Sequence, residues 1–343
     1  MKKKIPFFKT SYDYNEVKAF SKLVRSGNFS MGTATINFEK AIAKKLNIAD
    51  ANVALVSNCT TGLHLSMIVT GIKQNHEVLC SSLTFVADAN CIKYVGAKPQ
   101  FVDISSYKNW NMSVNDIKKK IKRNTKAIIM THYAGYPCEI AKIKKIVKQN
   151  KLILIEDACH TIFSKFKKKY LGTYGDLGVF SLYGNKNITT GEGGIVIGKK
   201  EYIKKIKILR NHAINKSMLE RNLLKTPTYQ IEELGYNYRI DDIRSTIGIE
   251  QLKKIDRLNN LRRKVAINYK KMINKELPEI IIPFSNFIGD NYSYHLFPIL
   301  LPTSIDREKL IKFLSSNSIQ TSIHYKPIHK LKFYKKRKFK LEN

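Results

Sequence analysis

The sequence predicts an α/β protein in which a large, mostly parallel sheet is covered by helices on both faces and is followed by a smaller α+β domain. Two observations predict this class. Between about residues 51 and 155, short apolar runs alternate with segments of helical periodicity, as in repeated strand–helix–strand units. These runs hold almost no polar residues, which is typical of strands that are buried on both faces.

Each element follows from its local pattern. Helices are expected where apolar residues recur every three or four positions, at 12–27, 36–47, 63–71, 85–94, 115–122, 140–149, 200–212, 240–275 and 306–317. Strands are expected at 51–56, 77–81, 100–102, 127–130, 152–155, 177–183, 195–197, 294–301 and 319–323. The long helical pattern at 240–275 could connect two domains, and we expect a large domain over 1–245 and a small one over 246–343.

Length and charge limit the possible functions. A chain of 343 residues is enough for about two domains. Its net charge of +34 comes from lysines that are spread over the whole chain, whereas a nucleic-acid-binding face needs a basic cluster or stripe. We therefore attribute the charge to a composition rich in Lys, Ile and Asn and expect no nucleic-acid partner. The charge would still attract a phosphate-bearing substrate.

Cysteine and hydropathy patterns exclude further classes. The five cysteines are scattered and form no C-x-x-C pair, so neither a zinc site nor a disulfide framework is indicated. No apolar run approaches the ~20 residues of a membrane-spanning helix, and the N-terminal pattern is not that of a signal peptide. We expect a cytoplasmic protein with no membrane partner and no bound metal.

Polar residues that follow the predicted strands are the candidates for chemistry, because ligands of open parallel sheets bind at the carboxyl ends of the strands. In SNCTTG (57–62), Thr60 and Thr61 open a helix that could bind a phosphate, although such residues are more often simple caps. Asp157 follows the strand LILI and could keep a heterocyclic nitrogen protonated, or cap the next turn. His160 lies on the same loop, where it could be a structural hydrogen-bonding residue.

Two further positions complete this set. Phe85 could stack on a planar ring or belong to the core. Lys186, with Ser181 before it, lies in a short Gly- and Asn-rich loop between two apolar strands. A lysine that loses hydration there is easier to deprotonate, as a Schiff-base lysine requires, while the alternative is a solvated loop residue. A phosphate cradle, a stacking ring, a carboxylate and an amine are together what pyridoxal 5'-phosphate (PLP) requires.

Several ordered blocks carry a resemblance to a known family. The strongest are SLTFVADANCIKYVGAKPQFVDI (82–104), IEDACH (155–160), GDLGVFSLYGNKNITTGEGG (175–194) and LGYNYRIDDIRSTIGIEQL (234–252). With these blocks the chain resembles the DegT/DnrJ/StrS family of PLP-dependent nucleotide-sugar aminotransferases over nearly its whole length. YGNKNITTGEGG looks most like the perosamine-synthase branch, which uses GDP-linked 4-keto sugars, whereas IHYKP (323–327) also suits branches that use UDP-linked sugars.

The resemblance implies a fold of the aspartate-aminotransferase type, fold type I, and a homodimer with its sites at the interface. It implies that Lys186 binds the cofactor covalently, that Asp157 pairs with the ring nitrogen, and that Phe85 stacks on the ring. The resemblance assigns Thr60, Thr61 and Ser181 to the phosphate and His160 to the ring hydroxyl. Asn237, with Arg239, would reach the phosphate of the neighbouring subunit.

The implied reaction moves an amino group from glutamate to a nucleotide-linked 4-keto-6-deoxy sugar, for a surface polysaccharide such as an O-antigen. Two alternatives stay open. Some relatives replace the lysine with histidine and act as dehydratases, whereas this chain keeps Lys186. Relatives also commonly continue for a few tens of residues beyond IHYKPIH (323–329), so we expect a truncated small domain, which would favour an inactive or regulatory relative.

Overall fold

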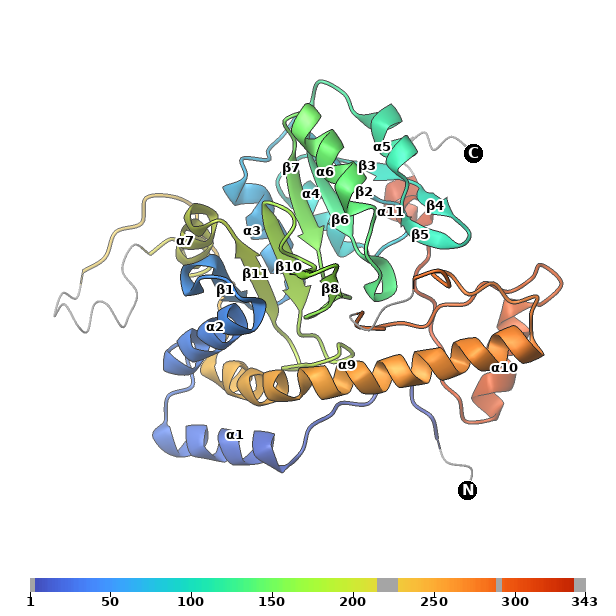
Figure 1. The fold of residues 1–343 in the computed structure, drawn as a ribbon. Coiled ribbons are helices and arrows are strands. Elements are labelled where there is room, and N and C mark those ends of the chain that lie inside the picture. Colours follow the sequence, from blue (N-terminus) through green and yellow to red (C-terminus); the bar gives the residue numbers. More distant parts are fainter. Residues whose placement is uncertain (1–3, 215–227, 288–291, 336–343) are drawn as a thin grey trace.

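A seven-stranded, mostly parallel sheet forms the centre of the computed structural model, which describes residues 4–214, 228–287 and 292–335 (Figure 1). The strand order is β1-β11-β10-β7-β6-β2-β3. Only β11 runs antiparallel to its neighbours, β1 and β10. The strands are β1 (Val53–Val56), β2 (Glu77–Ser81), β3 (Lys98–Val102), β6 (Thr125–Thr131), β7 (Ile153–Asp157), β10 (Leu177–Ser181) and β11 (Gly194–Gly198). Two short hairpins pair β4 (Ile104–Ser106) with β5 (Asn109–Met112), and β8 (Lys165–Phe166) with β9 (Lys169–Tyr170).

The helices cover both faces of this sheet, as the sequence predicts. They are α1 (Tyr14–Ser26), α2 (Thr33–Leu46), α3 (Cys59–Val69), α4 (Ala87–Tyr94), α5 (Val114–Lys120), α6 (Ile140–Gln149), α7 (Lys200–Leu209), α9 (Asp242–Glu276), α10 (Arg307–Ser316) and α11 (Lys332–Lys335). One core joins the sheet to α3, α4 and α7. Two others join it to α2 and α9, and to α5 and α6. Burial on both faces explains why the strands read as unbroken apolar runs.

Helix α9 runs along one side of the molecule, between α1 and the sheet domain, toward α10 (Figure 1). Its first residue, Asp242, is buried and ties it to the start of α2. Oδ1 of Asp242 accepts the backbone N–H groups of Gly32 and Thr35, at 2.8 and 2.9 Å, and Oδ2 accepts that of Ala34 at 3.0 Å. A carboxylate at a helix N-terminus satisfies N–H groups that have no partner within the helix. The predicted boundary at residue 245 therefore falls in the first turn of a continuous helix.

Two predicted strands of the C-terminal part are wrong. Residues 294–301 belong to no strand and form a single bridge, between Leu300 and Ile281. Residues 319–323 likewise form one bridge, between Ile319 and Ile5. Pro298 lacks the N–H that a longer ladder through 294–301 needs. In the described ranges, no helix is both long enough and apolar enough to cross a membrane.

Candidate active site

Lys186 lies in the connection between the two antiparallel strands β10 and β11. Ser181, the last residue of β10, is paired with Gly194, the first residue of β11. The chain turns sharply after β10, and the Lys186 N–H donates to the carbonyl of Tyr183 at 2.9 Å. This turn carries Lys186 past the end of the sheet and into a large cavity.

The amine of Lys186 is held among other functional groups. Its Nζ lies 3.4 Å from Nε2 of His295. Burial lowers the pKa of the Lys186 ammonium, and this effect is partly opposed by interactions with Cys159, Asp157 and Cys59. A lowered pKa makes the neutral, nucleophilic amine more accessible. Lys186 is therefore a cavity-lining amine and not a solvated loop residue.

Asp157 ends the buried strand β7 and keeps only 6% of its surface exposed. Its Oδ1 accepts the N–H of Cys159 at 2.9 Å, which is the turn contact that the capping alternative predicts. The carboxylate also lies close enough to Lys186 to interact with it electrostatically. The sequence thus brings the amine and the acid into one site, from two adjacent strands of the sheet.

The first turn of α3 contains Thr60 and Thr61, the residues that the sequence analysis assigns to the phosphate. Asn58 caps the helix by accepting the N–H of Thr61 at 2.9 Å, and the Thr61 hydroxyl donates to the carbonyl of Asn58 at 2.8 Å. The Thr61 side chain is therefore part of the cap itself. Thr60, the second residue of the helix, lies beside the free N–H groups that make helix N-termini suitable for phosphate.

Glycine brings this helix start against the sheet. A Cβ on Gly194 would lie 2.5 Å from the carbonyl oxygen of Asn58 and 2.9 Å from the nitrogen of Cys59. Only glycine lets the two backbones approach so closely. Because Gly194 is paired with Ser181, the Ser181 hydroxyl lies at the same end of the sheet as the start of α3. It accepts the N–H of Tyr183 at 3.2 Å.

Three rings line the site beside Asp157. His160 is buried, and its Nδ1 accepts the N–H of Ala134 at 3.2 Å. The proton is therefore on Nε2, which donates to the Tyr325 hydroxyl at 3.1 Å. Tyr325 is also 5.9 Å from the ring of Phe85. Phe85 is 54% exposed, so the alternative that it belongs to the core is wrong.

His295 is a site residue that the sequence analysis missed. Its Nδ1 lies 3.1 Å from Oδ1 of Asn187, whose Nδ2 donates to Asn259 and to the carbonyl of Ser293. These bonds leave Nε2 of His295 as an acceptor toward Lys186. Burial and the nearby Lys186 hold the pKa of His295 well below its usual range, so the imidazole is neutral.

Asn237 and Arg239 do not join Lys186 within the protomer. Asn237 is exposed and forms an isolated bridge with Asn211, which also accepts a bond from Arg239 Nη1 at 2.8 Å. The segment that contains Asn237 and Arg239 nevertheless runs beside the start of SNCTTG (57–62), because the Ser57 N–H donates to the carbonyl of Tyr238 at 2.9 Å. A role across a subunit interface remains a prediction.

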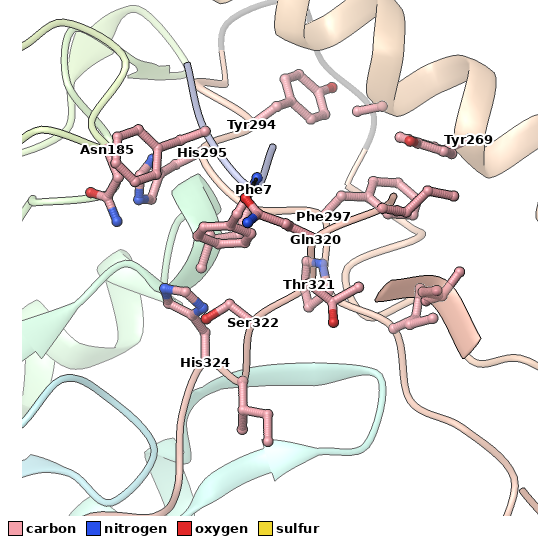
Figure 2. A pocket seen from close by; sticks show the side chains of 18 of the residues that line it. Phe7, Asn185, Tyr269, Tyr294, His295, Phe297, Gln320, Thr321, Ser322 and His324 are labelled. Atoms are coloured by element: carbon pink, nitrogen blue, oxygen red, sulfur yellow. Dashed lines mark hydrogen bonds between the residues drawn. The ribbon is translucent and has the colours of Figure 1, made fainter. Parts of the chain in front are cut away.

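A cavity of about 1310 Å³ opens from Lys186 toward α9 and α10. Figure 2 shows Asn185 and His295 next to each other on one wall, and His324 facing Phe7 on another. The rings of Phe7 and His324 are stacked, with centroids 5.4 Å apart. Three cationic side chains line the cavity as well: Lys9, Arg262 and Arg307.

These residues fit PLP. An amine of lowered pKa, a buried carboxylate, an exposed aromatic ring and a glycine-lined helix N-terminus meet at one end of the sheet. The fold and the site define the class of fold type I PLP-dependent transferases.

The comparisons with known proteins give the family. A profile described as the DegT/DnrJ/EryC1/StrS aminotransferase family matches residues 10–343. The chain is 36% identical over 311 residues to the GDP-perosamine synthase of Escherichia coli O157:H7, covering 89% of this chain and 80% of the relative. It is 33% identical over 338 residues to the UDP-4-amino-4,6-dideoxy-N-acetyl-beta-L-altrosamine transaminase of Campylobacter jejuni, covering 97% and 86%.

A solved structure of an aminotransferase has a similar fold. Helicobacter pylori PseC, an aminotransferase involved in the biosynthesis of pseudoaminic acid, matches with a TM-score of 0.90 and 26% identity, over 99% of this chain and 90% of that one. The chain belongs to the DegT/DnrJ/EryC1/StrS aminotransferase family. The predicted family, fold, sugar-aminotransferase class and PLP cofactor are confirmed, whereas the roles of the individual site residues remain predictions.

Proposed function

We propose that this protein transfers the amino group of glutamate to the ketone of a nucleotide-linked 4-keto-6-deoxy sugar, for surface polysaccharide biosynthesis. The observation that carries the proposal is the position of Lys186, which lies between Asp157 and a cavity large enough for a sugar nucleotide. The relatives named above act on GDP-linked and UDP-linked sugars, so the nucleotide stays open.

Each site residue then has a stated task. PLP, when bound, supplies an aldehyde that carries the amino group and a ring that accepts electrons. Lys186 Nζ would hold the aldehyde end, take the proton from the α-carbon of glutamate and deliver a proton to the sugar carbon that receives the amine. Asp157 would keep the ring nitrogen protonated, while Phe85 covers the ring and the start of α3 binds the phosphate.

The cavity is suited to the charged part of the substrate. Arg262 lines it and is anchored by a bond from Nη1 to the carbonyl of His295 at 3.4 Å. Lys9 and Arg307 add positive charge to the same walls. A pyrophosphate group is attracted by such charges, and a low-dielectric wall strengthens the attraction.

Product analysis tests the proposal. Purified protein is incubated with PLP, glutamate and a panel of GDP-, UDP- and dTDP-linked 4-keto sugars, and the products are weighed by mass spectrometry. We expect an amino sugar together with 2-oxoglutarate, and no amino sugar from the Lys186→Ala protein. A deoxy sugar formed without consumption of glutamate would instead identify a dehydratase.

The assembly and the cellular site are part of the same proposal. We infer a homodimer because Asn237 is exposed in the single chain although the family pattern places it at a neighbouring phosphate. Light scattering should give twice the mass of one chain, and the Asn237→Ala protein should lose PLP affinity without becoming monomeric. We also propose a cytoplasmic enzyme with a large domain over 1–245 and a small one over 246–343, so that α9 runs from one domain into the other.

A further inference from the structure

Asp88 is a buried acid beside the candidate active site. It lies in the first turn of α4, with none of its surface exposed. Its Oδ2 accepts the hydroxyls of Thr84 and Thr131, at 3.2 and 2.5 Å. Thr131 is the residue of β6 that pairs with Asp157 of β7. Thr131 therefore links Asp88 to Asp157, the acid that we assign to the cofactor ring.

The second oxygen of Asp88 defines its protonation state. Oδ1 is completely buried and has no hydrogen-bond donor among the residues that the structure describes. The neighbouring acid is Asp157, because its register partner Thr131 donates its hydroxyl to Asp88, and the two carboxyl groups interact electrostatically. Two ionised carboxylates are both acceptors and cannot bond to each other, whereas a protonated one becomes a donor.

The surroundings of Asp88 do not balance a negative charge. In the described part of the chain, it forms no ion pair with a lysine or arginine. The other titratable groups that interact with it include the thiols of Cys59, Cys80 and Cys91 and the hydroxyl of Tyr325. Burial first, and then the charge of Asp157, raise the pKa of Asp88 well above its usual range. An unpaired buried carboxylate is costly, so the neutral acid is the stable form.

We propose that Asp88 is a positioning residue that donates its O–H to Asp157 and thereby keeps the Asp157 carboxyl group directed at the cofactor ring nitrogen. This inference rests on the proposed role of Asp157. One proton shared in this way fixes the orientation of Asp157, while its other lone pairs stay available for the ring. The bond from Cys159 also holds the same carboxylate.

Two substitutions separate this role from simple packing. Asp88→Asn keeps a donor for Asp157 and an acceptor for the two hydroxyls, and it should leave the PLP dissociation constant within about threefold. Asp88→Leu removes the donor and should raise that constant about 10- to 100-fold, as expected for a lost hydrogen bond to a charged group. Thr84→Val, which removes one hydroxyl from Asp88 but not the contact with Asp157, is the matched control and should stay within about threefold of the unchanged protein.

Infrared spectroscopy tests the proton itself without PLP or activity. At neutral pH the unchanged protein should show the carbonyl stretch of a buried, protonated carboxylic acid, and the Asp88→Asn protein should lack it. The proposal is overturned if that band is absent, if it persists in Asp88→Asn, or if Asp88→Leu binds PLP as tightly as the unchanged protein. If the Asp88→Leu protein does not fold, the carboxylic-acid band of the unchanged protein and its loss in Asp88→Asn still test the proposal. If the unchanged protein shows the band but binds no PLP, the proposed function is refuted. The conclusion that Asp88 is protonated would still stand.

Discussion

The Nζ of Lys186 lies 3.4 Å from Nε2 of His295, although 109 residues separate the two in the chain. Asn187 holds the opposite ring nitrogen, so the lone pair of Nε2 faces the amine. A neutral imidazole in this position can orient Lys186 Nζ without adding a positive charge.

His295 should therefore affect the rate of transamination. In the His295→Phe protein the acceptor is lost, and we expect the rate to fall about 10- to 100-fold, the effect of one hydrogen bond to a charged group. His295→Gln, which keeps an acceptor, should retain more of the rate. Single-turnover reaction with glutamate measures this step, and an unchanged rate in His295→Phe would exclude the orienting role.

Removing Lys186 should have a much larger effect. The Lys186→Ala protein loses the group that moves the proton, and we expect the rate to fall by about 10⁴-fold or more. Circular dichroism and thermal unfolding serve as controls, because they show whether the Lys186→Ala protein keeps its fold. A Lys186→Ala protein with the normal rate would rule out this assignment.

Two of the buried histidines, His160 and His295, predict how the stability of the cofactor-free protein changes with pH. Burial and the nearby Lys186 hold the pKa of both His160 and His295 well below that of an exposed histidine. The unfolded chain therefore binds more protons on them, so their contribution to stability is complete above about pH 6.5 and is lost as the pH falls below it.

The loss should reach about 1.4 kcal/mol per pH unit for each histidine until the folded-state pKa is passed. Urea unfolding in steps from about pH 7 to about pH 5 measures the slope. The His295→Gln protein should show a slope smaller by about 1.4 kcal/mol per pH unit. Equal slopes for the two proteins would show that His295 does not stay neutral on folding.

Gly62 tests the close packing of α3 on the sheet. A Cβ at this position would lie 2.8 Å from Cγ1 of Val179 and 2.9 Å from Cγ2 of Val196. Gly62→Ala should destabilise the protein by about 1–3 kcal/mol, the usual effect of overpacking a core. At Gly184 the nearest atom would be 4.0 Å away, so Gly184→Ala is the control and should change the free energy of unfolding by less than about 0.5 kcal/mol. Comparable losses in both proteins would contradict the packing argument.

The sheet and its helices could be predicted from the sequence because their signals are local. Runs such as 152–155 are apolar on both faces, and helices such as α6 show a clear periodicity. The predictions of strands at 294–301 and 319–323 were wrong because a strand also needs a partner strand to pair with, and no local pattern in the sequence reports whether one is present. Their partners, Ile281 and Ile5, each supply one bridge.

Some residues of the candidate site could be predicted from local patterns, whereas others depend on distant contacts. Asp157 ends β7, and Lys186 lies in the loop after the neighbouring strand β10. Both positions could be predicted because each lies at or just beyond the carboxyl end of a strand with a clear apolar pattern. His295 reaches Lys186 from an irregular segment 109 residues further along the chain. Asp88 resembles any polar residue of a helix until Thr131 and Asp157 are placed around it. No spacing in the sequence encodes these two contacts.

The most direct test is to find which lysine carries the cofactor. The purified protein is loaded with PLP, the link is made permanent by borohydride reduction, and the digested protein is analysed by mass spectrometry. The account predicts that the cofactor mass is found on the peptide that contains Lys186, and that the Lys186→Ala protein gives no modified peptide. Modification at a different lysine, or at none, would contradict it.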